Sequence, residues 1–591
     1  MEKKSIYALF HEVCTKNKDS VAYRYKENGN WIDITWDQQY AQCKAISKSL
    51  IALGLEKDDK VNILSNTNLK WIQLDLSAVN IGSVTVGIYA SNLAQDCAYI
   101  INHCEAKIIF VENHDQLAKI EEVRSHLPHL KHVVTMGQFG SEKDWVLTWE
   151  AFVEKGADVN DDVFNERTSG VQPDDVASIV YTSGTTGVPK GAMITHQNLL
   201  FASWSASESL LIKPGFENLL FLPLAHVFAR IILYVCLRNN IVIAISEGID
   251  KVAENLQEIR PHFFASIPRI YEKVYEKITT GVQDAGGAKE KLFNWALGVG
   301  TQVSALKQAK KPIPGGLNVK NALANKLVFS KIQAALGGRI IYTISGAAPL
   351  NQKVAEFFHA CGVLILEGIG MTENTSFTNV NRYDNNRFGT VGQPGPGIEQ
   401  RIAGDGEVLY RGKNVMKGYF KNEDATAETI DKDGWLYTGD IGEIDDEQFL
   451  KITDRKKDLI ITAGGKNIAP QHVERAIRSS RYISQVVSIG DQRKYLSALI
   501  TLVPEEVQPW AVEQGIAFSS WEELVEKKEI RDFVEKEITR GNQELASYET
   551  IKKFCIIPND FSIEGGELTP TLKVKRKAIM EKYADKIAAM Y

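Results

Sequence analysis

The first part of the chain alternates apolar runs typical of strands with stretches of helical periodicity. Strand-like runs lie at 61–64, 84–88 and 107–111, and helix-like stretches lie at 69–79 and around Tyr99 and Ile101. This alternation predicts an α/β fold in which parallel or mixed sheets are covered by helices. In such sheets, ligands bind in the loops that follow the carboxyl ends of the strands.

An extended pair of strands is predicted ahead of this region, at 21–25 and 31–34. The string Thr35-Trp36-Asp37-Gln38 that follows is a capping-box pattern, in which two side chains accept backbone N–H groups at a helix start. A helix is therefore expected to begin directly after the second strand.

A loop rich in glycine and hydroxyl side chains separates a predicted strand at 176–181 from a helix-like stretch that begins near His196. Such a loop can turn backbone N–H groups and hydroxyls toward a polyphosphate, and Lys190 adds a positive charge. The alternative is a flexible surface turn, and Pro189 before the lysine departs from the Walker pattern. The candidate phosphate-binding residues are Thr182, Ser183, Gly184, Thr185, Thr186, Gly187 and Lys190.

Composition and charge narrow the class of protein. A chain of 591 residues is too long for one core, so a large domain and at least one further domain are expected. The formal charge of −6 gives no reason to expect nucleic acid as a partner. The seven cysteines lack CxxC spacing, which indicates buried thiols in a reducing compartment. Neither a signal-like apolar segment nor a run of ~18 apolar residues is found, so we expect a cytoplasmic protein, at most peripheral to a membrane.

Several later segments of the sequence contain residues that could bind ligands or take part in catalysis, but each also has a purely structural interpretation. A buried strand-like run in 337–350 ends in small residues, which let a flat ring approach the backbone. The strings 433–442 and 450–458 predict a hairpin with Asp433-Gly434 as its turn. By charge alone, 566–576 is typical of a basic solvated tail, and His226 is typical of a core histidine at a strand end.

Two neighbouring segments differ in character. Pro268 suits the first turn of a helix that carries Ile270, Val274 and Tyr275 on related faces. The stretch from about 280 to 326 is rich in lysine, glycine and alanine, which favours a solvated surface insertion.

Taken in order, these strings resemble the motifs of the AMP-forming adenylating superfamily, and most closely those of long-chain fatty-acid–CoA ligases. The loop at 180–191 resembles the phosphate loop, 337–350 the adenine-binding segment, and 366–373 the Tyr-Gly-x-Thr-Glu motif. The paired strings 433–442 and 450–458 resemble the fatty-acyl-CoA synthetase signature, and 222–230 and 263–275 resemble the long-chain branch. The resemblance covers nearly the whole chain.

The resemblance implies roles for individual residues. Thr372 would contact phosphate, Glu373 would hold Mg²⁺, and Lys573 would be the catalytic lysine. Asp440 would accept hydrogen bonds from the ribose hydroxyls, and Arg455 would fix ribose and phosphate. The other implied positions are Gly346, Ala347, Ala348, Glu367, Gly368, Ile369 and Gly370 for ATP or AMP, His226 for the acyl pocket, Lys457 for the hinge, and Gly464 and Gly465 for the CoA side.

The resemblance also implies a domain plan and a reaction. A large AMP-binding domain would span 1–455, with the insertion at about 280–326, and a small mobile α/β lid would span 456–591. A long-chain fatty acid would react with ATP and Mg²⁺ to form acyl-AMP, and CoA would then displace AMP after the lid rotates. Because long-chain ligases carry an insertion at this place, substrate entry or peripheral membrane contact is a second interpretation of it, and homodimerisation stays open.

Other functions remain open at this point. One is an acyl-AMP ligase that passes the acyl group to a carrier protein, which the long-chain string at 267–275 and the complete lid disfavour. Another is a catalytically silent nucleotide- or lipid-binding homologue, which the intact charged residues of the motifs disfavour. A luciferase-like oxygenase is a third, since no motif excludes it.

One departure from the family pattern lies in the 222–230 string. Ala229 stands where long-chain ligases usually carry a glutamate before the arginine, here Arg230. Any role of that glutamate is therefore in doubt for this chain.

A second departure is Ile369, which replaces the aromatic residue that usually packs on adenine. An aliphatic side chain keeps the buried area but loses stacking worth about 1 kcal/mol, so we expect somewhat weaker ATP binding and retained activity. Equilibrium binding should show that Ile369→Tyr binds ATP more tightly, and unchanged affinity in that variant would count against this explanation.

Overall fold

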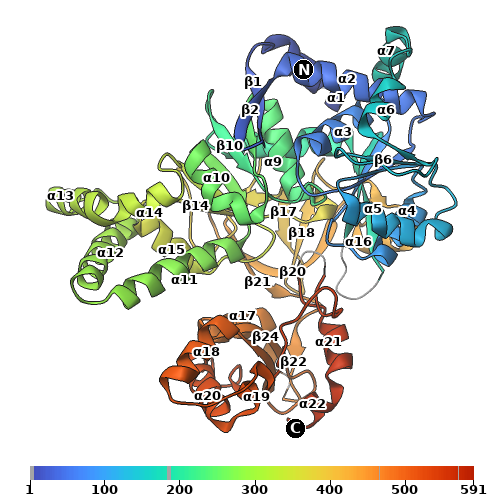
Figure 1. Cartoon of the computed structure of the whole chain (residues 1–591). Helices are drawn as coiled ribbons and strands as arrows, with labels where there is room; N and C mark the ends of the chain where they lie inside the picture. Colours follow the sequence, from blue (N-terminus) through green and yellow to red (C-terminus); the bar gives the residue numbers. More distant parts are fainter. Residues whose placement is uncertain (1–4, 183–187, 465, 570–571) are drawn as a thin grey trace.

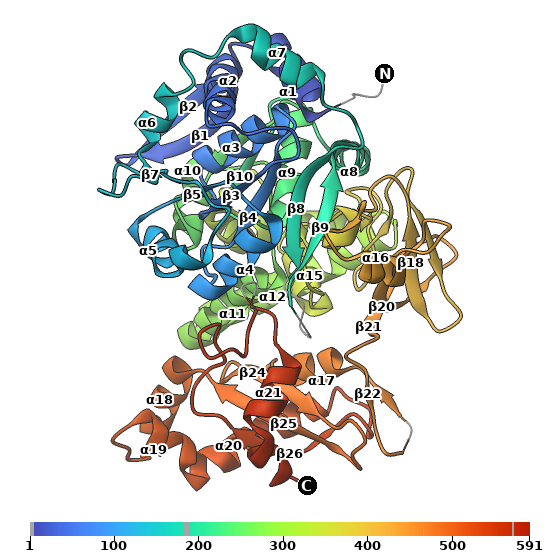
Figure 2. The same ribbon diagram turned by 90° about the vertical axis from the view of Figure 1, so that its right-hand side faces the viewer.

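The computed structural model describes residues 5–182, 188–464, 466–569 and 572–591. They form a large α/β body, up to β21 (Leu450–Arg455), and a small α/β body that begins at β22 (Ile460–Ile461). Figures 1 and 2 show the small body beneath the large one, joined to it by the chain that follows β21. The α/β fold with a large and a small part agrees with the expectation from the sequence.

The predicted alternating region forms one large sheet. Its strand order is β19 (Gly418–Tyr419), β9 (Lys190–Thr195), β8 (Val176–Thr182), β4 (Val84–Ile88), β3 (Lys60–Leu64), β5 (Ile108–Val111), β6 (His132–Thr135), β7 (Val146–Leu147). The strands from β8 to β7 pair in parallel, whereas β9 and β19 add antiparallel pairs at one edge. The helices of this region are α3 (Leu69–Asn80), α4 (Ala94–Cys104), α5 (His114–Val123), α6 (Trp149–Glu154) and α7 (Asp161–Ser169). The predicted strands and helices are confirmed.

A second large sheet combines distant parts of the chain. Its order is β16 (Gln393–Pro394), β15 (Asn379–Val380), β14 (Ile365–Ile369), β13 (Tyr342–Ser345), β12 (Phe263–Ser266), β10 (Glu217–Leu220), β11 (Val242–Ile245), β1 (Val21–Glu27), β2 (Asn30–Thr35). The predicted pair β1–β2 is antiparallel, and the capping box at Thr35 and Gln38 begins α2 (Trp36–Ala52) as expected. Helix α9 (Val227–Arg238) packs on α8 (His196–Ser209) and is buried along nearly its whole length, so it lies inside the large body.

An antiparallel sheet completes the large body. It contains β17 (Glu399–Ile402), β18 (Glu407–Arg411), β20 (Leu436–Ile444) and β21 in that order. The predicted hairpin is confirmed as β20–β21. The prediction that Asp433-Gly434 forms its turn is wrong, because these residues precede β20. The strands are joined instead at Asp445, whose side chain accepts the backbone N–H groups of Glu447 and Phe449.

The small body has its own core. Its strands are β22, β23 (Asn467–Ile468), β24 (Ile483–Ile489), β25 (Leu496–Leu502) and β26 (Ile551–Ile556). Its helices are α17 (Pro470–Ile477), α18 (Pro504–Glu513), α19 (Trp521–Glu526), α20 (Lys528–Asn542), α21 (Arg576–Lys582) and α22 (Ala584–Ala588). Leu524 and Val525 of α19 and Val534 and Ile538 of α20 are buried, which confirms the predicted amphipathic stretch.

The lysine-rich stretch is helical and projects from the large body. Helix α11 (Pro268–Ala285) begins at the proline as predicted and leads to α12 (Gly287–Gln308), α13 (Gly315–Ala324), η3 (Asn325–Phe329) and α14 (Ser330–Ala335). We call 287–335 the helical arm, and Figure 1 shows it at the left, away from the small body's helices. The arm is followed by α15 (Gln352–Ala360).

The remaining helices of the large body are α1 (Ile6–Lys16), α10 (Val252–Ile259) and α16 (Glu423–Thr429). None of the helices among the described residues has the length and apolar character needed to cross a membrane.

A buried ion pair ties three elements of the large body together. Arg230 of α9 pairs with Asp75 of α3, and both side chains are almost fully buried. Tyr234 also donates to Asp75, at 2.8 Å, and Arg230 donates to Ser178 of β8. Arg230 therefore has a carboxylate partner in Asp75, although the residue before it in the chain, Ala229, has no carboxylate.

Removing the carboxylate alone should destabilise this core strongly. Asp75→Ala leaves the buried guanidinium without its partner, so the free energy of unfolding should fall by about 3–5 kcal/mol. Urea denaturation measures this loss. The matched control is Glu399→Ala, which removes an exposed partner of Arg411 and should change the free energy of unfolding far less, because exposed ion pairs contribute little. Equal, small losses in both variants would show that the Arg230 network does not hold these elements together.

Candidate active site

The described ends of the predicted phosphate loop lie together at the edge of the first sheet. Thr182 ends β8 and is paired in register with Lys190, the first residue of β9. The Thr182 hydroxyl donates to the Lys190 carbonyl at 3.3 Å. The other predicted residues of the loop, Ser183 to Gly187, lie outside the described residues.

Tyr419 links Lys190 to Glu373. The Lys190 ammonium lies 4.9 Å from the centroid of the Tyr419 ring, and the Tyr419 hydroxyl donates to Glu373 Oε1 at 2.6 Å. Glu373 follows Thr372 in the short helix η4 (Thr372–Asn374) and is 8% exposed. Burial, and then the charge of Glu373, raises the pKa of Tyr419, which therefore stays a hydrogen-bond donor. Sequence analysis missed Tyr419, because only the pairing of β19 with β9 brings it to residue 373.

Lys573 of the small body lies among charged residues of the large body. Burial lowers its pKa and the charge of Arg455 lowers it further, whereas Glu373 and Asp440 act in the opposite direction. The same ammonium adds to the effect of burial on His226, whose pKa falls to about 4. Lys573 is thus half-buried between the two bodies. The prediction of a basic solvated tail, made from charge alone, is therefore wrong for this residue.

Asp440 and Arg455 face each other across the β20–β21 hairpin. They are a register pair, and Arg455 Nε lies 3.2 Å from Asp440 Oδ1. Burial raises the pKa of Asp440, while Arg455 and then Lys573 oppose that rise. Glu407 supports the hairpin from behind, since it accepts the Gly439 N–H at 2.7 Å and pairs with Lys456 at 2.8 Å. Glu407 and Lys456 were also missed, because their contacts cross strands.

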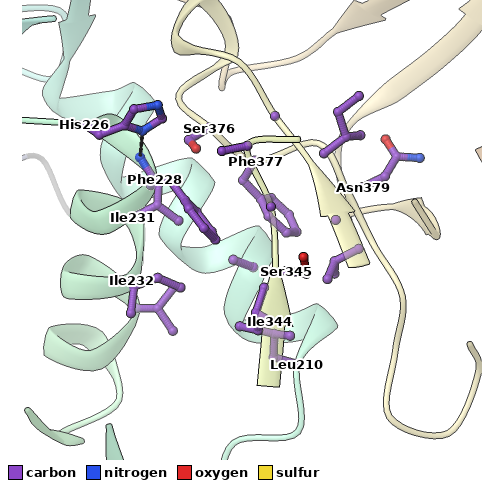
Figure 3. A pocket seen from close by; sticks show the side chains of 18 residues that line it. Leu210, His226, Phe228, Ile231, Ile232, Ile344, Ser345, Ser376, Phe377 and Asn379 are labelled. Atoms are coloured by element: carbon purple, nitrogen blue, oxygen red, sulfur yellow. Dashed lines mark hydrogen bonds between the residues drawn. The ribbon is translucent and has the colours of Figure 1, made fainter. Parts of the chain in front are cut away.

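An apolar cavity with a volume of about 40 Å³ lies beside α9 (Figure 3). Figure 3 shows Phe228, Ile231 and Ile232 of α9 on one side, with Ile344 and Phe377 opposite. The full lining is Ala206, Leu210, His226, Phe228, Ile231, Ile232, Val235, Ile344, Ser345, Gly346, Ala347, Gly368, Ile369, Gly370, Ser376, Phe377, Asn379 and Val380. The cavity therefore brings the predicted acyl-pocket residue together with most of the predicted adenine-side residues.

Local geometry explains two of these positions. His226 caps the start of α9, where its Nδ1 accepts the Phe228 N–H at 3.1 Å, so it is not at a strand end. Gly346 follows β13 directly, and a Cβ there would stand 3.0 Å from the Phe228 ring. Glycine at 346 thus leaves room for the ring that borders the cavity.

Glu367 lies close to the contact between the two bodies. Its side chain is 8% exposed and accepts the Leu350 N–H at 2.9 Å. Burial raises its pKa to about 7, and Arg475 of α17 in the small body opposes this rise. Nearby in the chain, Lys353 of α15 pairs with Glu544 of the small body at 2.6 Å.

The remaining predicted residues lie outside the cavity lining. Ala348 is exposed after β13, Lys457 is exposed in the turn after β21, and Gly464 is exposed on the small body. Gly465 lies outside the described residues.

The donor set around Glu373 suits a magnesium ion held together with a polyphosphate. Among the described residues, no group of three or more histidine, cysteine or acidic side chains could enclose a metal. Mg²⁺ usually binds through one or two carboxylates, with phosphate and water oxygens completing its shell. Glu373 fits that requirement, since Tyr419 donates to its Oε1 and no described residue donates to its Oε2.

Comparisons with known proteins agree with this geometry. A family model described as AMP-binding enzyme matches residues 10–420, and one described as AMP-binding enzyme C-terminal domain matches residues 457–591. The chain is 35% identical over 594 residues to the long-chain-fatty-acid–CoA ligase FadD15 of Mycobacterium bovis, covering 100% of this chain and 97% of that protein. It is 34% identical over 621 residues to the long-chain-fatty-acid–CoA ligase ACSBG2 of Xenopus laevis, covering 99% and 84%.

Solved structures share the fold at lower sequence identity. The adenylation domain of a carboxylate reductase from Mycobacterium chelonae aligns with a TM-score of 0.78 at 19% identity, covering 99% of this chain and 91% of that one. The anthranilate CoA ligase AuaEII, in complex with anthranoyl-AMP, aligns with a TM-score of 0.71 at 19% identity, covering 100% and 99%.

The buried carboxyl of Glu367 should make stability depend on pH. Its pKa is raised from the ordinary 4.5 to about 7. The stability that the protonated carboxyl contributes is therefore complete below about pH 4.5 and is lost as the pH rises through 7. Between these limits, Glu367→Gln should gain up to about 3 kcal/mol in free energy of unfolding relative to the unsubstituted protein. Urea denaturation across this range measures the gain. The exposed Glu513 provides the control Glu513→Gln, and a pH-independent difference for Glu367→Gln would refute the assignment.

Proposed function

Because the chain belongs to the AMP-binding enzyme family, we propose that it joins long-chain fatty acids to CoA, using ATP and forming an acyl-AMP intermediate. The observation that carries the proposal is the position of Lys573, where its charge acts on Glu373, Asp440 and Arg455 of the large body and on His226, which lines the apolar cavity. Full-length relatives named long-chain-fatty-acid–CoA ligases support the substrate class.

In the first half-reaction, a fatty carboxylate oxygen attacks the α-phosphorus of ATP. A bond forms between that oxygen and phosphorus, and the bond to the β-phosphate oxygen breaks, releasing pyrophosphate. Two anions must approach each other, so the residues act mainly by position and charge. Lys573 and Lys190 would place ammonium groups there, and the hydroxyls and amides of 182–187 would donate to phosphate. Mg²⁺ held by Glu373 would supply further positive charge to the phosphates.

The apolar cavity would take the acyl chain. Each methylene that leaves water contributes about 0.8 kcal/mol to the free energy of binding, so the depth of an apolar channel determines which chain lengths bind best. His226 stands at the cavity with a pKa of about 4 and is neutral near pH 7. The neutral His226 side chain would border the fatty carboxylate without adding charge. Lys573 would then supply the positive charge from the small body.

The nucleoside would be held at the same end of the large body. Asp440 would accept hydrogen bonds from the ribose, and Arg455 would orient both the Asp440 carboxylate and the phosphate. Gly346, Ala347 and Ala348 would border one face of the adenine, and Ile369 would pack on the ring. Thr372 would donate to phosphate beside Glu373.

In the second half-reaction, the CoA thiol attacks the acyl carbonyl and AMP leaves. Lys573 belongs to the small body, so rotation of that body would withdraw it and open the acyl-AMP to CoA. We take 456–591 as the lid and 1–455 as the adenylation domain, with Lys457 as the hinge and Gly464 and Gly465 as the part of the lid turned toward CoA.

The cellular compartment of the protein is inferred from its cysteine side chains. All seven cysteines are free, and all but Cys555 are buried. Free thiols are typical of reducing compartments, which supports a cytoplasmic enzyme.

Removing the Lys573 ammonium should separate the two half-reactions. Lys573→Ala should slow acyl-AMP formation by about 100-fold or more, since one electrostatic donor in such sites is worth that much. Thioester formation from supplied acyl-AMP and CoA should change only a few-fold, because Lys573 has then left the site. Pyrophosphate release and acyl-CoA formation measure the two steps.

The control for this variant is Lys536→Ala, which removes an exposed lysine of α20 and should leave both steps unchanged. Equal losses of both steps in Lys573→Ala would refute its role. Pyrophosphate release that proceeds without any CoA-dependent turnover would favour a ligase that loads a carrier protein.

A further inference from the structure

A second cavity lies in the half of the large body opposite the small body. Its volume is about 470 Å³, which is within the range of roughly 300–1,000 Å³ typical of small-molecule sites. Figures 1 and 2 show α2, α3 and α6, which supply parts of its wall, on that side of the molecule. Among the described residues, it shares none of its lining with the apolar cavity beside α9. We call it the second cavity.

The topology of the first large sheet places the second cavity where α/β proteins bind ligands. Strands β3 and β5 are neighbours, but α3 leads from β3 to β4 on one side, and α5 leads from β5 toward β6 on the other. Ligands of such sheets bind outside the carboxyl ends of two strands whose connections diverge in this way. Lys70 in the first turn of α3 and Glu112 directly after β5 both line the second cavity.

Lys70 brings a positive charge to this cavity without an ion-pair partner. Its ammonium donates to the Met136 carbonyl and lies 4.4 Å from the centroid of the Trp149 ring. Neither contact is with an anion, and no carboxylate of the described residues forms an ion pair with Lys70. Burial lowers the pKa of Lys70, and the charge of Glu150 opposes this only in part. Because partly buried charges in proteins are usually paired, the ammonium is suited to receive an anionic group.

The start of α3 adds to this preference for an anion. Asn68 caps the helix by accepting the Trp71 N–H at 2.9 Å. The N–H groups of Leu69 and Lys70, the first two of the helix, have no acceptor within it. Asn68, Leu69 and Lys70 all line the second cavity, so the positive end of the helix dipole and the ammonium lie at the same wall.

The charge of the remaining wall limits the anion to a single negative charge. Glu27 is exposed at the end of β1, and Glu112 accepts the backbone N–H and the side-chain amide of Asn66 at 2.9 and 3.0 Å. Both carboxylates line the second cavity beside the one lysine. A polyphosphate would be repelled by them, whereas a monocarboxylate would match the one ammonium.

Apolar side chains provide the surface for the body of the ligand. Ile34 of β2, Ile46 of α2 and Trp149 of α6 line the second cavity from three different elements. A ligand that is only a small anion would leave this surface uncovered. An aliphatic or aromatic group attached to the carboxylate would cover it, and apolar contact would then add to the binding free energy.

We propose that the second cavity is a binding site for a small amphipathic monocarboxylate. Its carboxylate would lie at Lys70 and the start of α3, and its aliphatic or aromatic body would pack on the apolar wall. Helix α3 links this site to the cavity beside α9, because Asp75 of the same helix pairs with Arg230 of α9. The proposal does not rest on the proposed function.

Isothermal titration calorimetry of the full chain, without ATP, tests the site with three probes. Octanoate has an aliphatic body, indole-3-acetate has an aromatic one, and acetate has the carboxylate alone. We expect octanoate, indole-3-acetate or both to bind at the second cavity, and acetate to bind more weakly because it lacks the apolar body. Comparison of the first two probes shows which kind of body the site takes.

Two variants locate this binding. Lys70→Met keeps the length of the side chain and removes its charge, so binding should weaken by about 10-fold or more. Ala45→Phe places a ring in the cavity wall and keeps the lysine, so binding should be lost. The matched controls are Lys155→Met at the end of α6 and Ala41→Phe on α2, both at exposed positions outside the lining. Both controls should bind as the unsubstituted protein does.

The proposal is overturned if neither octanoate nor indole-3-acetate binds, or if both bind Lys70→Met and Ala45→Phe as tightly as they bind the controls. In the second case the probes occupy another place, such as the cavity beside α9. Acetate binding as tight as that of the larger probes would overturn the amphipathic class. Melting temperatures identify any variant that folds poorly, and the other variant then carries the test. No turnover is measured, so failure of the proposed function would leave this result unaffected.

Discussion

The approach of two anions is the constraint on which the rest of the proposed site depends. A carboxylate and a phosphate can meet only where positive charge is already in place, and one of the cations here, Lys573, comes from a separate body. Burial lowers the pKa of that ammonium, while Glu373 and Asp440 favour its charged form. The proposed site is therefore complete only when the small body is seated against the large one, and the proposed rotation of the small body would remove this charge.

The large body, in contrast, holds its part of the site rigidly. Arg230 and Asp75 tie α9 to α3 and β8, so the wall of the apolar cavity and the strand before the phosphate loop share one buried network. Tyr419 connects Lys190 to Glu373, and Glu407 anchors the hairpin that carries Asp440. A fixed large body, and a cation carried by a separate body, suit the two successive reactions proposed for this site.

Much of the fold could be predicted from the sequence, because local patterns decided it. The alternating strands and helices from β3 to β5, the capping box at Thr35 and the proline start of α11 all depend on neighbouring residues. The hairpin turn was misplaced, since Asp433-Gly434 and Asp445 are both good turn formers and only strand pairing selects between them. Tyr419 and Glu407 could not be found, because their contacts join segments distant in the chain. The residues implied by family resemblance, such as Glu373 and Lys573, were reachable only through that resemblance.

The most direct test of the account is AMP formation by the purified protein with ATP and Mg²⁺, measured across fatty acids from short to very long, with and without CoA. The account predicts turnover that requires CoA and is fastest with long chains, because the cavity beside α9 is apolar and CoA must release AMP. Absence of AMP formation with every fatty acid, in the presence of CoA, would contradict it.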